Sequence, residues 1–136
     1  MSNYKAQMSN QIQNPNKKIY DLEERTAKFG ENVIEFIKIF RRDEINRPLI
    51  SQLIRSATSI GANYMEADGA ESKRDFLHKI ALCKKESKET KHWLRMIAKA
   101  NPEKRTGCLV LWQEVQELTL IFSSISKSKK NKEFDI

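Results

Sequence analysis

Apolar residues recur at three- and four-residue steps along four segments of the chain, near residues 21–41, 48–67, 72–100 and 107–126. This spacing places them on one side of a helix, so the sequence predicts four amphipathic helices and almost no strand. The predicted inner stripes are Leu22, Thr26, Phe29, Val33, Phe36 and Phe40; Leu53, Ile54, Ala57, Ile60, Gly61, Tyr64 and Met65; Phe76, Ile80, Cys83, Ser87, Thr90, Leu94 and Ile97; and Leu111, Val115, Leu118, Phe122 and Ile125.

Residues typical of helix ends bound these segments, and the links between them are short. Because links of a few residues force neighbouring helices to run antiparallel, the fold expected is an all-α, up-and-down four-helix bundle. The predicted end signals are Asp21 with Glu24 as a capping pair, Pro48 in a first turn, Ser72 with Asp75 as a capping box, and Asn101 before Pro102 as a stop.

The second segment carries a dense run of small residues between Gln52 and Glu66. A glycine inside a helix costs about 1 kcal/mol relative to alanine, so Gly61 is expected to have a packing role. A small-residue face lets another helix approach closely. Four polar residues lie among these small residues, and they could hold a ligand. We favour the alternative that they form a partly buried hydrogen-bond network, which fixes the helix register or joins subunits. They are Arg55, Ser59, Asn63 and Glu66.

A chain of 136 residues suits one domain. The expected layout is a disordered N-terminal tail at 1–18, the bundle at 19–126, and a basic flexible C-terminal tail at 127–136. The polar N-terminus lacks the apolar core of a signal peptide, and polar residues interrupt the longest apolar stretch, so we expect a cytoplasmic protein without a membrane span. Cys83 and Cys108 lack metal-ligand spacing and fit reduced, buried thiols, with a single disulfide left open.

The positive charge of the chain gathers on the third predicted helix. The whole chain carries 25 basic and 18 acidic residues, a net charge of +7, whereas residues 72–99 alone carry a net charge of +6. A row opposite the inner stripe would extend about 37 Å along this helix, enough to contact several phosphates of a nucleic acid. We predict a nucleic-acid-binding face made of Arg74, Lys85, Lys88, His92, Arg95 and Lys99, with His78 in the same row.

A solvated lysine-rich face is the plainer interpretation of this row, and it remains open at this point. Aromatic residues that could stack on bases are scarce there, with only His92 and the adjacent Trp93 as candidates. Sequence-independent contact with phosphates of RNA or DNA is therefore favoured over the reading of bases. We expect Trp93 to serve in packing or in a subunit contact.

Catalytic and metal chemistry find little support in the sequence. His78 and His92 are separated by about 21 Å along one helix and cannot share an ion. The chain lacks the two Glu-x-x-His motifs that di-iron bundles use, since only Glu89 and His92 have this spacing, and it has no glycine-rich phosphate loop and no nucleophile elbow. We therefore expect no enzyme activity, no metal and no cofactor.

Three blocks of the sequence resemble one protein family. The stretch from Gln52 to Asn63, followed by Glu66 and by residues 72–76, is similar to the signature of the four-helix bundle proteins of 23S rRNA intervening sequences. Residues 85–94 and 21–26 also resemble that family, and the similarity covers about residues 20–126. The family pattern often has a glycine after the glutamate of the second helix, where this chain has Ala67.

The resemblance implies a small non-enzymatic protein that assembles as a ring-like homo-oligomer, a pentamer. It is similar, more distantly, to accessory proteins of diversity-generating retroelements, which bind nucleic acid and a reverse transcriptase. Our reading is a cytoplasmic bundle that self-associates and presents the basic face to nucleic acid, RNA in the first place. The alternatives are an adaptor that docks an acidic protein or a reverse transcriptase, and a structural oligomer whose charge serves solubility.

Overall fold

The computed structural model describes residues 21–134, and this part of the chain forms four α-helices without a β-strand. The predicted N-terminal tail, residues 1–18, lies outside the described residues. A single 3₁₀ turn, η2, joins the last two helices at Pro102–Lys104. The helices are α2 (Leu22–Ile37), α3 (Asn46–Asp68), α4 (Lys73–Ala100) and α5 (Arg105–Phe134).

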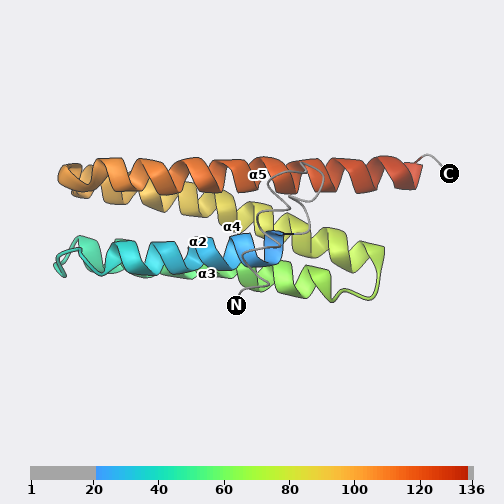
Figure 1. Ribbon diagram of the computed structural model, residues 1–136, viewed down its shortest axis with the longest axis horizontal. Helices are drawn as coiled ribbons and strands as arrows, with labels where there is room; N and C mark the ends of the chain where they lie inside the picture. The colour runs from blue at the N-terminus through green and yellow to red at the C-terminus, as the bar shows by residue number, and fades with distance from the viewer. Residues whose placement is uncertain (1–20, 135–136) are drawn as a thin grey trace, which may run out of the picture.

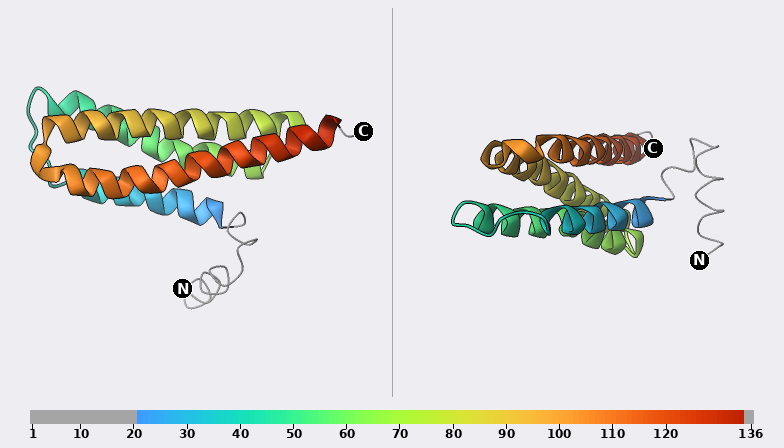
Figure 2. Two further views of the ribbon diagram at one scale, coloured as in Figure 1. Left: turned by 90° about the horizontal axis from the view of Figure 1, so that it is seen from above. Right: turned by 60° about the vertical axis from the view of Figure 1, so that its left-hand side comes forward.

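Consecutive helices run antiparallel along the long axis of the molecule (Figure 1). Helix α4 packs against both α3 and α5, whereas α2 packs mainly on α3 and contacts α5 less. The α2–α3 and α4–α5 links lie at the same end of the bundle, and Figure 2 shows the same arrangement from two other sides. The all-α, four-helix prediction is confirmed.

Most of the buried side chains belong to the predicted inner stripes, and Ile37, Ile50 and Cys108 are buried in addition. The prediction was wrong for Met65, which is 60% exposed because the buried side of α3 continues from Ile60 through Tyr64 to Ala67. Phe29, Leu53, Leu94 and Phe122 each expose 1% or less of their surface. Truncating such a side chain to alanine typically costs 2–5 kcal/mol because a cavity remains. The stripe of α4 is buried from Ile80 to Ile97 through the residues Cys83, Ser87, Thr90 and Leu94, as its spacing predicts.

Helices α2 and α3 approach each other closely through their glycines. A Cβ added at Gly61 would lie 3.3 Å from Thr26 Oγ1 and 3.5 Å from the Thr26 carbonyl carbon, and one added at Gly30 would lie 3.7 Å from Thr58 Cα. The small-residue face predicted for residues 52–66 is therefore used within the chain, against α2.

The end of α2 differs from the prediction. The helix stops at Ile37 rather than at Arg41, because Phe40 turns into the core and packs edge-on against Phe36, with ring centres 4.9 Å apart. Arg42 Nη1 then donates hydrogen bonds to the carbonyls of Ile37 and Phe40. At the other end, Asp21 occupies the predicted N-cap position of α2, but its side chain makes no capping hydrogen bond to the helix.

The ends of α3 and α4 follow local polar chemistry. Ser72 Oγ accepts a hydrogen bond from the Asp75 amide at 3.0 Å, and α4 ends at Ala100, before Asn101 and Pro102, so both predictions are confirmed. Helix α3 begins at Asn46, with Pro48 in its first turn. Asp43, in the link before this helix, accepts hydrogen bonds from the amides of Ile45 and Asn46 and so caps this start.

Helix α5 is longer than predicted at both ends. It begins at Arg105 and runs to Phe134, so residues 127–134 of the predicted flexible tail are helical. The apolar stripe ends at Ile125, which is why the pattern suggested a tail. The segment beyond it nevertheless contains neither glycine nor proline and is rich in lysine, which is a good helix former.

Candidate nucleic-acid interface

One side of α4 is exposed along the whole length of the helix. Helices α3 and α5 pack on its flanks and the inner stripe faces the core, so exposed positions recur at heptad spacing on the remaining side. Apart from Ala81, every member of this row is a basic residue or a histidine. All six predicted binding residues are exposed and lie in it: Arg74, Lys85, Lys88, His92, Arg95 and Lys99.

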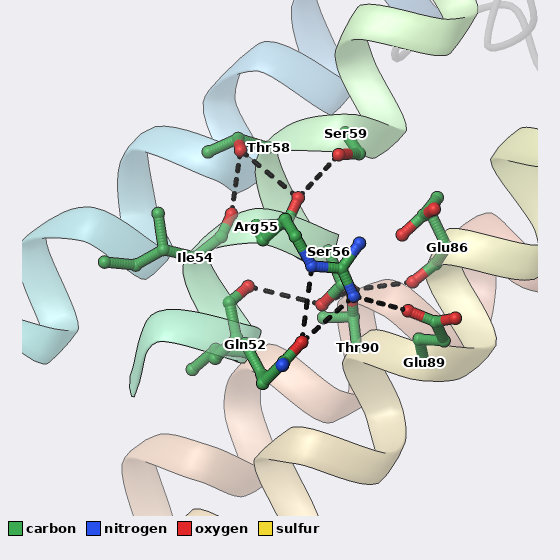
Figure 3. Close-up of polar contacts among 10 residues, drawn as sticks. Gln52, Ile54, Arg55, Ser56, Thr58, Ser59, Glu86, Glu89 and Thr90 are labelled. Atoms are coloured by element: carbon green, nitrogen blue, oxygen red, sulfur yellow. Dashed lines mark hydrogen bonds and ion pairs between the residues drawn. The ribbon is translucent and has the colours of Figure 1, made fainter. Parts of the chain in front are cut away.

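The charge of this row is not neutralised within the described part of the chain, where none of its lysines and arginines forms an ion pair. The acidic residues of α4 lie elsewhere. Asp75 stands in the first turn, and Glu86 and Glu89 lie half-buried beside Arg55 of α3 (Figure 3). The row therefore presents positive charge to solvent at Arg74 and from Lys85 to Lys99, within a total length of about 37 Å.

Other lysines of α4 hold the bundle together. Lys79 Nζ lies 3.1 Å from Glu66 Oε2 of α3. Lys91 Nζ donates a 2.6 Å hydrogen bond to Gln116 Oε1 of α5 and lies 5.6 Å from the ring centre of Trp112. Lys79 and Lys91 thus join α4 to neighbouring helices, whereas the lysines and arginines of the exposed row form no such contact with the described residues.

The four polar residues predicted as a network on α3 face α4 or their own helix. Arg55 lies 3.1 Å from Glu89 Oε2, and Glu66 pairs with Lys79, so the two charged residues each reach α4 and do not pair with each other. Ser59 donates to the Arg55 carbonyl, and Asn63 donates to the Ser59 carbonyl. Figure 3 shows Arg55 between Gln52 and Glu89 at this seam. Their role in joining subunits stays a prediction.

Glu86 is under electrostatic strain at the same seam. Its pKa is raised, first by desolvation and then by the neighbouring Glu89, while Arg55 and Lys85 act in the opposite direction. Its Oε2 atom is buried and has no hydrogen-bond partner among the described residues. The carboxylate form therefore costs folding free energy.

Two buried polar contacts between helices were not predicted from the sequence. Thr90 Oγ1 lies 2.9 Å from Ser56 Oγ, which places a hydroxyl pair in the core between α4 and α3. Asn46 and Asn101 bind each other through both amide groups at one end of the bundle. A serine or threonine in a helical stripe indicates only that the position is buried, and an asparagine before a proline indicates only a helix end. Neither pattern identifies the residue on the other helix that forms the hydrogen bond.

Burial keeps both thiols protonated at neutral pH. The pKa of Cys83 is raised to about 12 and that of Cys108 to about 11, in both cases through desolvation. Since the thiolate is the reactive form, neither cysteine has the character of a nucleophile. Among residues 21–134, no group of three or more histidine, cysteine or acidic side chains is arranged to hold a metal ion, and no helix is long and apolar enough to cross a bilayer.

Comparison with known proteins agrees with this architecture. A crystal structure of a protein with unknown function from the S23 ribosomal protein family of Bacteroides thetaiotaomicron VPI-5482 matches with a TM-score of 0.66 and 26% identity, over 78% of this chain and 98% of that one. A search of curated proteins found no significant match. The family model described as 23S rRNA-intervening sequence protein matches residues 18–124. The chain belongs to the 23S rRNA-intervening sequence protein family.

Proposed function

We propose that this protein is a non-catalytic nucleic-acid-binding protein that contacts phosphates through the exposed basic row of α4. One observation carries the proposal: the row is exposed, interrupted only by Ala81 and free of ion pairs with the described carboxylates, while the carboxylates of the same helix lie outside it. Solubility depends on the net charge of the surface, so it does not require the basic residues of α4 to lie on one side of the helix and the acidic residues on another.

RNA is the first ligand to test, because the description of the family names ribosomal RNA. Exposed lysines and arginines on one helix face contact phosphates without reading base edges, so the binding is expected to be largely independent of sequence. The affinity should then fall steeply with salt, with a slope of about −0.7 per phosphate contact for a single strand.

The decisive measurement is the salt dependence of RNA binding by a triple variant, Lys85→Glu, Lys88→Glu and Arg95→Glu. If the row binds phosphates, the variant loses most of its affinity and the salt slope becomes shallower by about 2, as three contacts disappear. Helicity should stay unchanged, because all three side chains are exposed.

A charge-matched control separates a local surface from a general effect of net charge. Lys28→Glu, Lys38→Glu and Arg47→Glu change the net charge by the same amount at exposed positions outside α4. This control should keep most of the affinity. Equal losses in both variants would refute the α4 surface, and retrieval of a protein partner without any affinity for RNA would favour an adaptor instead.

We further propose that the functional form is a homo-oligomer that displays several copies of the row, a pentamer by analogy with the family. Large apolar side chains that are exposed in the single chain are the candidate contacts between copies. Light scattering in solution should give a multiple of the chain mass of 15.9 kDa, and a monodisperse monomer would overturn this part. These candidates, all more than half exposed, are Ile39, Ile45, Met65, Val110 and Leu120.

A further inference from the structure

The basic row of α4 ends beside an apolar groove between α4 and α5. The groove has a volume of about 330 Å³, at the lower end of the range for small-ligand sites. Its lining is mostly apolar and contains no carboxylate. It is formed by Leu94, Arg95, Ala98, Arg105, Cys108, Leu109 and Trp112.

A second, polar hollow adjoins this groove and shares three of its residues, Arg95, Ala98 and Arg105. Lys99 and Pro102 complete its lining, which again contains no carboxylate. Arg95 belongs to the basic row as well. The apolar surface is therefore bordered by three cations and continues into the proposed phosphate-binding face.

Trp112 supplies an aromatic ring to the groove. Its side chain is 36% exposed although it stands on a helix that packs against α4. The Lys91 ammonium group, 5.6 Å from the ring centre and bound to Gln116, helps to hold the indole in place. An exposed aromatic ring within a cationic groove is the arrangement by which proteins bind single-stranded nucleic acids, because bases stack on the ring while phosphates meet the charges.

We infer that this groove holds an unpaired base of a single-stranded RNA, stacked on Trp112, with the adjoining phosphates on Arg95, Lys99 and Arg105. The inference rests on the proposed function and narrows its ligand to single strands. Charge complementarity argues for this occupant, since a purely apolar partner would leave the three cations of the rim without a counterpart. A base in a duplex is paired and stacked, so it cannot enter the groove without being flipped out.

The test compares oligouridylate with an RNA duplex of the same length, using wild-type protein, Trp112→Leu and Trp112→Phe. Leucine keeps an apolar side chain but removes the ring, whereas phenylalanine keeps a ring. We expect Trp112→Leu to weaken oligouridylate binding roughly 5- to 100-fold, the effect of losing one stacked base. Trp112→Phe should stay close to wild type, and duplex affinity should be the same in all three proteins.

Tryptophan fluorescence gives a readout that does not depend on replacing Trp112. The chain has two tryptophans, so Trp93→Phe leaves Trp112 as the only one. The Trp93 Nε1 atom is buried without a partner among the described residues, so this background should fold normally. Oligouridylate is expected to quench Trp112 emission, and the duplex is not.

The results with oligouridylate and with the duplex distinguish a failure of the stacking site from a failure of the proposed phosphate-binding face. If oligouridylate binds wild type and Trp112→Leu equally, or leaves Trp112 emission unchanged, the stacking site is refuted while the phosphate face stands. A wild-type protein that binds neither RNA refutes both. A change of particle mass in Trp112→Leu would make the groove a contact between copies of this chain, which also overturns the inference.

Discussion

Asn46 and Asn101 form a closed pair of side-chain amides at the end of the bundle where both helix links turn. Asn46 Nδ2 donates to Asn101 Oδ1 at 3.1 Å and to the Arg41 carbonyl at 2.9 Å, and Asn101 Nδ2 donates to Asn46 Oδ1 at 2.9 Å and to the Ile97 carbonyl at 3.0 Å. Both amides thus use both donor hydrogens and their oxygen, although both residues are buried. This pair ties the start of α3 to the end of α4.

Replacing either partner with alanine should leave the other amide buried and partly unsatisfied. We expect Asn46→Ala and Asn101→Ala each to lower the free energy of unfolding by about 1–3 kcal/mol in urea titrations. The double variant should lose less than the sum of the two, because the second change removes groups that the first left unpaired. Asn63→Ala, which affects only a half-buried bond within α3, should cost clearly less. Additive single effects would contradict the pairing.

Glu86 should make stability depend on pH in an unusual direction for a carboxylate. Its pKa is raised in the folded protein, so the penalty for its charge is fully present above that pKa and disappears below the ordinary value of 4.5. Glu86→Gln should therefore raise the melting temperature at neutral pH, and the gain should vanish as the pH falls toward 4. Melting curves between pH 4 and pH 8 measure this.

Glu89→Gln is the matched control for that prediction. Glu89→Gln removes the ion pair with the exposed Arg55 and also the repulsion between Glu89 and Glu86, so the two effects oppose each other and stability should change by no more than about 1 kcal/mol. A gain from Glu86→Gln that persists at pH 4, or an equal gain from Glu89→Gln, would contradict the account of the seam.

At the level of helices, the glycines differ in what surrounds them. A Cβ added at Gly107 of α5 would lie 2.3 Å from Phe36 Cε1 of α2, a clash, whereas one at Gly30 would meet only ordinary contacts at 3.7 Å. Gly107→Ala should therefore displace the Phe36 ring and lower the free energy of unfolding by about 1–3 kcal/mol. Gly30→Ala should raise it by up to about 1 kcal/mol through helix propensity. Equal effects in urea titrations would show that α2 and α5 do not approach as described.

The pattern of the sequence was sufficient to predict the helices and most of their buried faces, because each stripe repeats over more than three turns. The ends were predicted where the signal is local, as with Ser72 and Asn101. They were missed where the cause lies elsewhere in the fold. Helix α2 ends early because Phe40 packs into a core formed by other helices, and Gly107 is explained only by Phe36, far away in the chain.

The same division applies to the candidate site. The basic row depends on the spacing of residues within one helix, so the sequence could predict that Lys85, Lys88 and Arg95 share an exposed side. The groove beside it could not be predicted, because Arg95 and Trp112 stand on different helices and meet only through the packing of α4 on α5. A periodic pattern locates a surface on one helix, whereas a site between helices requires the fold.

For the whole molecule, the number of basic rows on one particle should determine how affinity depends on RNA length. An RNA no longer than one row, about 37 Å, can contact a single copy, whereas an RNA several times longer can contact several copies at once. Each later contact is then intramolecular, and the affinity of the long RNA should exceed that of the short one by 10²-fold or more. Competition between the two RNAs at constant salt, at equal nucleotide concentration, measures this ratio. A long RNA also offers more positions at which one row can bind, and this alone raises its affinity in proportion to its length. If the long RNA exceeds the short one by no more than this factor, the particle presents only one row to each RNA.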